Sequence, residues 1–389
     1  MKIAIITDTH FGGRRGSKTF HDFFQKFYDE IFFPELEKRG IKYCIHMGDA
    51  FDNRKNIDYW SLNWAKENVY DKFKNLGVKV WQLVGNHDIY YKNTNEINSI
   101  DSLLEHYDNV TPVSTPDTYD INGFKAMMLP WICDENYDET CSKINDSSAK
   151  VAFGHLELTG FELYPGMVQQ GGIDKQIISK FDTVFSGHYH TRSNDGQTFY
   201  LGNPYEMYWN DCGDKRGFNI LDTETMEIEF VENTNTIFEK IYFDSTPAAT
   251  FKAHLYKDKI VKLFVKSRKS QLEYDKFLEK LLKAGIIDLK VVENTAINDT
   301  EVDLDGEKVE DTLTLLNKYI EDSDFDLEKE RVKKLLKEVY LEACEAEYCT
   351  FYHFTEKKEK ALMLSQMMMA TRLCIFLNKK MTLQDTQAC

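Results

Sequence analysis

Five short apolar segments of the sequence each end in aspartate, asparagine or histidine, the residue types that bind metal ions without sulfur. The segments are residues 3–6, 43–47, 78–84, 151–153 and 183–185. The candidate ligands that follow them are Asp8, His10, Asp49, Asn86, His155, His188 and His190. One strand-end aspartate is commonly a turn residue or a helix cap. Five such ends in one chain are difficult to obtain from turn chemistry, so we interpret them as one site at the carboxyl ends of strands.

Oxygen and imidazole ligands without thiolate suit a pair of manganese, iron or zinc ions. Two ions about 3.5–4 Å apart can hold a phosphate between them, stabilise the attacking and leaving oxygens, and lower the pKa of bound water. Such a pair needs a carboxylate that bridges both ions, and Asp49 is the candidate. The pattern therefore predicts hydrolysis of a phosphate ester.

Each of these residues has a simpler explanation when it is taken alone. Asp8 could be a turn residue, and His10 and His155 could be buried histidines of the core. Side chains alternate along a strand, so His188 and His190 would point to opposite faces unless the turn after Gly187 redirects both. Taken together, the residues favour the metal site.

The elements that position these residues follow from hydrophobic periodicity. The first strands alternate with helices expected at residues 19–39, 58–73 and 95–106, which predicts a largely parallel sheet. Residues 110–243 are rich in short strands, with a hairpin across Asn122-Gly123, and predict a second sheet packed on the first. Beyond residue 250 the pattern predicts a small β-α-β unit, and two helices are expected at 312–320 and 327–344.

Composition limits the possible classes of function. The chain has 389 residues and a formal net charge of −16, which argues against broad charge-driven binding to nucleic acid. It has no run of about 18 apolar residues, so no membrane contact is expected, and its N-terminus lacks the plan of a signal peptide. The eight cysteines are scattered, which favours free thiols in a reducing compartment.

The ordered motifs Asp-x-His, Gly-Asp-x-x-Asp, Gly-Asn-His-Asp, Gly-His and Gly-His-x-His resemble those of the calcineurin-type metallophosphoesterases. Within that family the sequence is similar to the SbcD-type nuclease subunits that process DNA double-strand breaks, and most to the recombination endonuclease subunits of T-even-type phages. The resemblance covers about residues 1–347. It implies an α/β fold, a four-layer αββα sandwich over residues 1–243, with a capping domain at 250–295, an acidic linker at 296–311, and partner-binding helices at 312–347. Residues 348–389 form a tail to which it assigns no role.

The resemblance also implies a role for each motif residue. Asp8, His10, Asp49 and His190 would hold one ion, and Asp49, Asn86, His155 and His188 would hold the other. His87 would face the scissile phosphate and assist the leaving oxygen. Asp52 would orient His87 through a hydrogen bond, although some members of the family have histidine at this position.

The function that the resemblance implies is Mn²⁺-dependent cleavage of DNA in recombination and break repair, with two Mn²⁺ ions that Mg²⁺ could replace. The implied partners are double-stranded DNA ends, single-stranded DNA, and an SbcC-type SMC-like ATPase with a long coiled coil, bound to a homodimer within a heterotetramer. The implied location is the cytoplasm of a phage-infected bacterium. The alternatives are another metallophosphoesterase, either a phosphoprotein phosphatase or a cyclic-nucleotide phosphodiesterase, and a mainly architectural clamp on DNA ends.

Two further sets of residues have a functional and a structural explanation. Arg14, Arg15 and Lys18 follow the first motif and could contact DNA phosphates or form a solvated loop. The helices at 58–73 and 95–106 could carry a dimer contact or pack only on their own sheet. The residues concerned are Trp60, Trp64, Ile97, Ile100, Leu103 and Leu104.

Overall fold

The computed structural model describes residues 1–293, apart from 165–166, 169–170, 247–249 and 268–269. These residues all belong to the first of two units of the chain, Met1–Asp305. The acidic linker from 296, the helices expected beyond residue 312 and the tail at 348–389 lie outside the described residues. Among the helices that are described, none is long and apolar enough to cross a membrane.

The first of two six-stranded sheets contains the strands expected at the start of the chain. β1, β2, β3 and β4 run parallel to one another, and β13 and β14 extend the sheet antiparallel beyond β1. The sheet is therefore largely parallel at its start, as predicted. Its strands in spatial order are β14 (Ile228–Asn233), β13 (Arg216–Asp222), β1 (Lys2–Ile6), β2 (Tyr43–His46), β3 (Lys79–Leu83) and β4 (Val110–Val113).

The second sheet also has a parallel centre, formed by β12, β10, β7 and β6, with an antiparallel strand at each edge. The predicted hairpin across Asn122-Gly123 joins its last two strands. In spatial order the strands are β11 (Ser193–Asn194), β12 (Thr198–Tyr200), β10 (Thr183–Gly187), β7 (Val151–His155), β6 (Phe124–Leu129) and β5 (Asp117–Ile121). A short antiparallel pair, β8 (Glu162–Tyr164) and β9 (Met167–Val168), lies between β7 and β10 in the chain.

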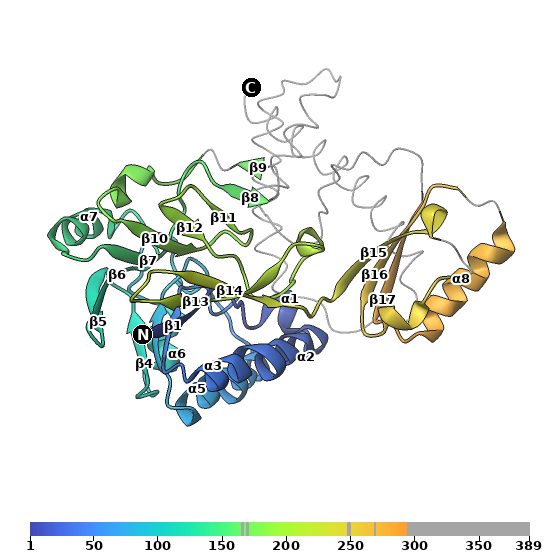
Figure 1. The fold of residues 1–389 in the computed structure, drawn as a ribbon, viewed down its shortest axis with the longest axis horizontal. Coiled ribbons are helices and arrows are strands. Elements are labelled where there is room, and N and C mark those ends of the chain that lie inside the picture. Colours follow the sequence, from blue (N-terminus) through green and yellow to red (C-terminus); the bar gives the residue numbers. More distant parts are fainter. Residues whose placement is uncertain (165–166, 169–170, 247–249, 268–269, 294–389) are drawn as a thin grey trace, which may run out of the picture. The chain divides into compact units, whose positions relative to one another are not determined.

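The two sheets stack face to face between layers of helices, which confirms the predicted αββα sandwich (Figure 1). Strand alternation explains the layers. Ile3 and Ile5 of β1 lie in the core between the sheets, with Phe153 of the second sheet. Ala4 and Ile6 face the other way and pack with the helices. A separate hydrophobic core lies on the far side of the second sheet, where Ile144 packs with side chains of β6, β7 and β10.

The helix predicted at 19–39 forms with a wide π-type turn at Tyr28–Phe32 in its middle, and the helix at 58–73 has a similar turn at Lys66–Tyr70. The third helix begins later than predicted, because the Asn98 side chain accepts the N–H of Asp101 and caps it. A helix that the sequence did not predict, α7, covers the second sheet. The helices of the sandwich are α1 (Gly13–Gly16), α2 (Lys18–Phe27), α3 (Phe33–Arg39), α4 (Tyr59–Ala65), α5 (Asp71–Asn75), α6 (Ser99–Leu104) and α7 (Tyr137–Asp146).

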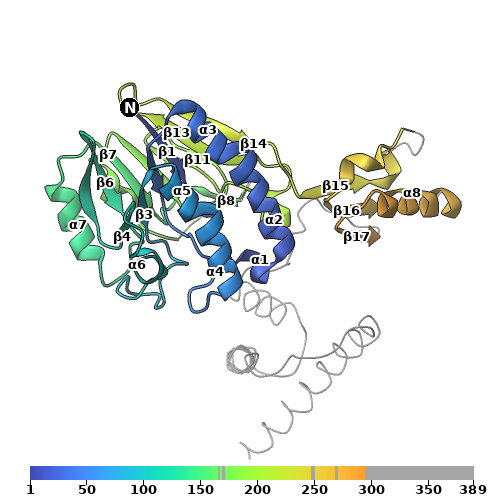
Figure 2. The ribbon, with the colours of Figure 1, turned by 90° about the horizontal axis from the view of Figure 1, so that it is seen from below.

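A third, smaller sheet of three parallel strands is covered by one helix, as expected for a β-α-β unit (Figure 2). Its elements are β15 (Phe238–Tyr242), β16 (Ile260–Val265), α8 (Gln271–Lys283) and β17 (Asp288–Glu293). The strand at 238–243 had been expected in the main sandwich. It pairs instead with β16, so the third sheet begins before the expected boundary at residue 243. Glu206 holds the start of this strand by accepting the N–H groups of Ile237 and Phe238 at 2.6 and 2.9 Å.

Candidate metal centre

All seven predicted ligands lie at the carboxyl ends of neighbouring parallel strands. β1, β2 and β3 are adjacent in the first sheet, and β7 and β10 are adjacent in the second. Parallel strands end at the same edge of a sheet, so the loops after them meet there. Within the part of the chain that the structure describes, three groups of histidine and aspartate are close enough to bind a cation: Asp8, His10 and His190; Asp49, His155 and His188; and His10, Asp49 and His87.

The first ligand set, Asp8, His10 and His190, joins both sheets. The Nε2 atoms of His10 and His190 are 3.1 Å apart. The Asp8 Oδ1 atom lies 3.8 Å from His190 Nε2 and 4.0 Å from His10 Nε2. One carboxylate oxygen and two imidazole nitrogens therefore surround a common point, which fits a divalent transition metal.

The second ligand set is Asp49, Asn86, His155 and His188. The amide oxygen of Asn86 lies 2.9 Å from His155 Nε2 and 2.9 Å from His188 Nδ1. His155 Nε2 is also 3.3 Å from the Asp49 Oδ2 atom. The other ring nitrogen of His155 lies 2.8 Å from the carbonyl oxygen of Met47, which fixes the ring and aims Nε2 into the site.

Asp49 lies between the two ligand sets. Its Oδ2 atom is 3.3 Å from His155 Nε2 and 3.9 Å from His10 Nε2. Its Oδ1 atom accepts the backbone N–H of His87 at 2.8 Å. Asp49 is thus the carboxylate that reaches both sets, which is the position that a bridging ligand requires.

The backbone is bent at the ligands themselves. Asp8, His10, Asp49 and His188 all have positive φ values, of 53°, 45°, 52° and 84°. Non-glycine residues rarely adopt this conformation, and it concentrates at functional sites. At His188 the bend also breaks the alternation of the strand. As a result His188 and His190 both reach the site, one in each ligand set.

Glycines make room for the ligands at two of the strand ends. A Cβ atom on Gly85 would lie 2.2 Å from the Asp49 Oδ1 atom. A Cβ atom on Gly187 would lie 2.1 Å from Thr7 Oγ1 and 2.9 Å from Asp8 Oδ2. Only glycine therefore allows the two carboxylates to approach the strand ends this closely.

The carboxylates of the site favour positive charge at two of its histidines. Burial alone would lower the pKa of His10, but the carboxylates of Asp52, Asp49 and Asp8 outweigh it and raise that pKa to about 10. Burial is likewise outweighed at His155, where Asp49 and Asp8 raise the pKa to about 9. The other two imidazoles differ, because burial lowers the pKa of His188 to about 3 and holds the pKa of His190 well below its usual range, so both are neutral and able to act as ligands.

His87 lies beside the ligands and is held by the backbone of Asp52. Its Nδ1 atom is 2.6 Å from the carbonyl oxygen of Asp52. A carbonyl can only accept, so Nδ1 is the donor and Nε2 is left free to hold or release a proton. The Asp52 carboxylate points elsewhere, with its Oδ1 atom 3.5 Å from His10 Nδ1. The contact expected between the Asp52 side chain and His87 is therefore made by the backbone, and the side chain faces a ligand.

Sequence reasoning gave no role to Asp88, which fastens two of the ligand loops together. Its carboxylate accepts the N–H groups of Gly85 at 2.9 Å, Phe51 at 3.2 Å and Ala50 at 3.4 Å. Asp88 therefore connects the loop of Asp49 to the loop of Asn86. Its place directly after His87 was the only indication in the sequence.

Trp131 forms part of the wall beside the second ligand set. Its ring centroid is 5.2 Å from that of His188 and 6.1 Å from that of His155. Its backbone N–H donates to the carbonyl of Val84 at 2.8 Å, at the end of β3. The main chain at Trp131 is thus held at the end of β3, and its indole lies next to two of the imidazoles.

The predicted DNA contacts lie on the turn that follows His10. Arg14 and Arg15 have left-handed φ values of 56° and 60°, and Arg15 is exposed. The Arg14 guanidinium is 5.2 Å from the ring centroid of Phe20. Lys18 is exposed and pairs with Asp22 at 2.8 Å. Two of the three cations thus already have protein contacts, whereas Arg15 faces solvent.

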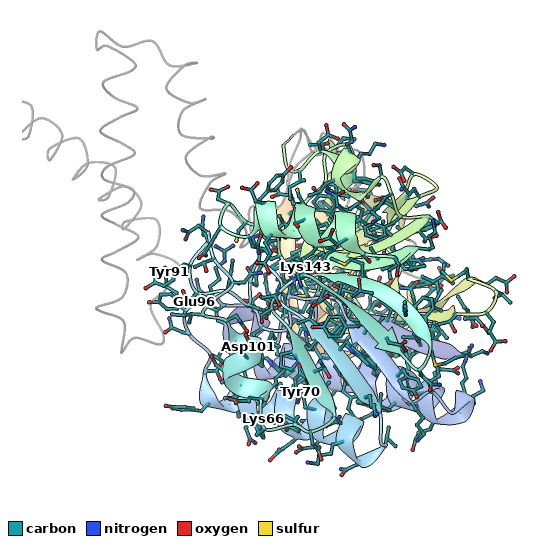
Figure 3. The ribbon with its side chains drawn as sticks, turned by 90° about the vertical axis from the view of Figure 1, so that its left-hand side faces the viewer. Lys66, Tyr70, Tyr91, Glu96, Asp101 and Lys143 are labelled. Carbon is teal, nitrogen blue, oxygen red and sulfur yellow. The ribbon has the colours of Figure 1, made fainter. Side chains whose placement is uncertain are left out.

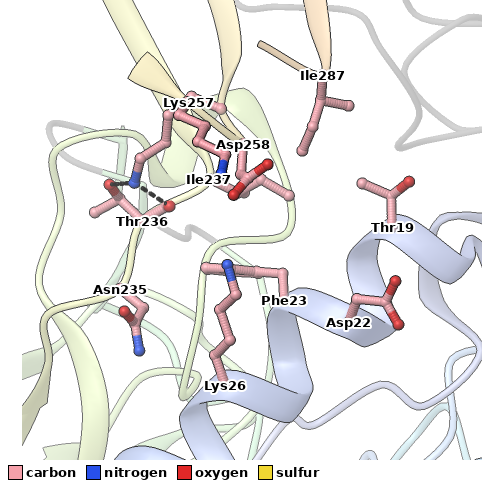
Figure 4. A pocket seen from close by; sticks show the side chains of 11 residues that line it. Thr19, Asp22, Phe23, Lys26, Asn235, Thr236, Ile237, Lys257, Asp258 and Ile287 are labelled. Atoms are coloured by element: carbon pink, nitrogen blue, oxygen red, sulfur yellow. Dashed lines mark hydrogen bonds between the residues drawn. The ribbon is translucent and has the colours of Figure 1, made fainter. Parts of the chain in front are cut away.

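A cavity of about 420 Å³ lies away from these ligands, between α2 and the segments that lead into the third sheet (Figure 4). Lys26, Lys257 and Lys259 contribute to its lining together with Asp22 and Asp258. No predicted site residue lines it, and its opposite charges do not define a ligand.

Comparison with known proteins identifies the family. Residues 1–192 match the family model of the calcineurin-like phosphoesterases. With the fold and the ligand sets, this match defines a metal-dependent phosphodiesterase, a hydrolase. The chain is 31% identical over 316 residues to exonuclease subunit 1 of Enterobacteria phage T4, which covers 79% of this chain and 90% of the relative. The chain therefore belongs to the calcineurin-like phosphoesterase family, as its motifs implied.

Among solved structures, the chain has a weak similarity to one described as a novel archaeal phosphodiesterase. The identity is 16% and the TM-score is 0.32, over 60% of this chain and 100% of the archaeal one.

Proposed function

We propose that the protein is a DNA nuclease that acts in recombination and double-strand-break repair. The observation that carries this proposal is the pair of ligand sets that share Asp49, with His87 beside them. The similarity to the phage exonuclease subunit, which extends over 90% of that relative, supports DNA as the substrate. Acidic overall charge is compatible with this substrate, because ions bound among the carboxylates would locally offset it.

The ligand sets would hold two divalent ions, for which we propose Mn²⁺, with Mg²⁺ as a possible substitute. Ions held there would supply Lewis acidity and water of lowered pKa. The protein orients the ligands through the backbone contacts of His155 and Asp88. His87 would keep one proton on Nδ1, against the Asp52 carbonyl, and would give a second proton from Nε2 to the leaving oxygen.

Binding of the DNA strand would use positive charge near the site. Arg14, Arg15 and Lys18 lie on the turn and helix directly after His10, and we propose that they contact backbone phosphates. Arg15 is the strongest candidate, since it is exposed on the turn. Such contacts do not read sequence and weaken as salt is added.

We propose two protein contacts. The segment 312–347 would bind the coiled coil of an SbcC-type SMC-like ATPase, and exposed residues of α4 and of the loop before α6 would form a homodimer within a heterotetramer. Trp60 and Ile97 are 42% and 51% exposed, and Tyr91 and Glu96 lie at the outer edge of the fold (Figure 3). Leu104 and Ile100 are fully buried and Trp64 is 8% exposed, so these three belong to the core of the chain itself, and the half-buried Leu103 packs against the same core.

The dimer is tested by light scattering on variants with one added charge. Trp60→Glu or Ile97→Glu should halve the mass, whereas Leu255→Glu, at a 63% exposed position outside the sandwich, should not. An unchanged mass in folded Trp60→Glu and Ile97→Glu would reject this surface as the dimer contact.

The nuclease function is tested with three substrates and two conditions. The protein is incubated with linear duplex DNA, with single-stranded DNA and with p-nitrophenyl phosphate, each with and without Mn²⁺. Ion-dependent cleavage of DNA is the expected result. The proposed natural setting of this activity is the cytoplasm of a phage-infected bacterium. Hydrolysis of the small ester with intact DNA would instead favour a phosphatase or a cyclic-nucleotide phosphodiesterase. Protection or tethering of DNA ends without hydrolysis would favour an architectural clamp.

A further inference from the structure

A buried arginine lies directly behind the first ligand set. Arg216 is the first residue of β13 and is only 3% exposed. One of its terminal nitrogens donates to the backbone carbonyl of His190 and to the side-chain oxygen of Asn203. The other donates to Asp211 at 2.9 Å and to Asp214 at 3.0 Å. A single guanidinium thus connects a ligand residue to a segment that sequence reasoning did not associate with the site.

The same segment reaches the other ligands of this set. The second oxygen of Asp211 accepts the N–H groups of Met207 and Tyr208 at 2.7 and 2.9 Å. The hydroxyl of Tyr205 then donates to the carbonyl of Thr9 at 2.6 Å, and Thr9 lies between Asp8 and His10. Residues 203–211 therefore contact the backbone on both sides of the first ligand set.

The network is specific to one ligand set. The second set is fixed by other groups, namely the Met47 carbonyl at His155 and the Asp88 carboxylate at the loops of Asp49 and Asn86. The described contacts of the Arg216 side chain involve His190 but none of Asn86, His155 and His188. A substitution of Arg216 should consequently affect the first ligand set more than the second.

Guanidinium chemistry explains why an arginine is needed here. Its planar fork donates in fixed directions to several acceptors at once, which the single ammonium of lysine does not reproduce. Loss of one partner from a buried charged group leaves the others without compensation. Both the hydroxyl of Tyr205 and the carboxylate of Asp211 are also buried, so the network has little water to replace a lost contact.

We propose that Arg216 is a positioning residue that sets the ion affinity of the first ligand set, Asp8, His10 and His190. It does so by fixing the His190 backbone and the 203–211 segment that holds Thr9. This inference rests on the ion sites of the proposed function and adds a specific control of one of them. Partners of ligands in such positions typically change metal affinity by about 10–100-fold when mutated.

The experiment is a calorimetric Mn²⁺ titration of the ion-free full chain, without DNA. Wild type is expected to bind two ions. Arg216→Lys should weaken one ion by about 10–100-fold and leave the other within about twofold. Arg39→Lys is the matched control, because Arg39 also pairs with two carboxylates, Glu35 and Glu229, but it precedes β2, whereas the ligand Asp49 follows the end of that strand. This control should bind both ions as wild type does.

A double-mutant comparison assigns the weakened ion. Asp8→Asn should weaken the same ion, and Arg216→Lys should add little to it in the double variant, since both act on one site. Tyr205→Phe keeps the ring and removes only the donor to Thr9, so it provides a second test if the Arg216 variant fails to fold. It should weaken the same ion in the same direction.

Three results would overturn the proposal. The first is wild-type affinity for both ions in folded Arg216→Lys and Tyr205→Phe. The second is equal weakening of both ions, which would indicate a general structural role. The third is a wild-type chain that binds no ion, which would reject the ion sites as well. Wild-type protein that binds two ions but leaves DNA intact would reject only the nuclease function, and the titration of the variants would still decide the role of Arg216.

Discussion

The Nε2 atoms of His10 and His190 lie 3.1 Å apart, although 180 positions separate the two residues in the chain. One imidazole follows the first strand of the first sheet and the other follows β10 of the second. The site thus exists only because the two sheets stack with their strand ends together. Any change that shifts one sheet along the other would separate these two nitrogens.

Asp49→Ala should remove both ions and all phosphodiester hydrolysis, because Asp49 is the carboxylate that reaches both ligand sets. Metal content by elemental analysis and cleavage of DNA measure the two effects. Asp182→Ala, at an exposed position before β10, should keep both ions and full activity. Two tightly bound ions in the Asp49 variant would show that Asp49 is not the bridge.

His87→Asn should keep both ions yet slow DNA cleavage by about 10²–10⁴, the usual loss when a general acid is removed. The reason is that Nε2 of His87 is the free imidazole nitrogen beside the ligands, while Nδ1 is committed to the Asp52 carbonyl. Single-turnover cleavage at saturating Mn²⁺ separates this effect from ion binding. Turnover within a few-fold of wild type would remove His87 from the mechanism.

Asp52→Asn makes a contrasting variant, since it changes the carboxylate near His10 but leaves the carbonyl that holds His87. We expect Asp52→Asn to lose less activity than His87→Asn. Excess Mn²⁺ should largely restore the activity of the Asp52 variant. In the ion-free chain the pKa of His10, now about 10, should fall, because Asp52 contributes to raising it. An NMR titration of the His10 ring measures the shift. A cleavage defect as large as that of His87→Asn, at saturating Mn²⁺, would contradict this separation.

Glu206 should make the stability of the fold depend on pH. Burial raises its pKa from 4.5 to about 7, although the N–H groups of Phe238 and Ile237 favour its charged form. Between these two pKa values the folded chain binds more protons than the unfolded one. The contribution of Glu206 to the free energy of unfolding therefore falls as the pH rises from about 4.5 to 7. The shift corresponds to at most about 3 kcal/mol.

Glu206→Gln should lack this contribution while still accepting the two N–H groups. Urea unfolding at pH 4.5 and at pH 7.5 should therefore show that the free energy of unfolding of the variant increases relative to that of wild type as the pH rises. Glu227→Gln, at an exposed position before β14, should run parallel to wild type. A constant difference between Glu206→Gln and wild type across this range would contradict the raised pKa.

Deletion of residues 310–389 should abolish association with the ATPase but keep Mn²⁺-dependent cleavage of single-stranded DNA, since every ligand lies within residues 8–190. Deletion of 348–389 alone should affect neither property. Co-purification and cleavage assays on the two shortened chains measure both. Full-stoichiometry binding of the ATPase to the chain that ends at residue 309 would place the main contact on the sandwich.

The ligand residues could be predicted from the sequence because each ends an apolar run, and parallel strands of one sheet end at the same edge. The layers followed from the same runs, since alternate residues such as Ile3 and Ala4 face different cores. The residue types at the end of each strand are thus visible in the local sequence, and the sheet then brings them together into one site.

Other features depended on contacts that local patterns do not carry. In the sequence, the segment that forms β15 directly follows the strands of the main sandwich, whereas its pairing with β16 depends on a partner further along the chain. Likewise, the Asp52 carboxylate lies 3.5 Å from Nδ1 of His10, a contact with another strand-end loop that no local pattern carries. Arg216 looks like an ordinary charged residue before a strand, and only the packed loops around it reveal its burial.

The indole of Trp131, fixed 5.2 Å from the His188 ring, gives the protein a built-in optical probe. A paramagnetic ion in the second ligand set would quench its emission, whereas a diamagnetic ion of the same charge would not. The chain has five tryptophans, so Trp131→Phe isolates this contribution to the fluorescence. Filling of the second ligand set could then be followed in real time.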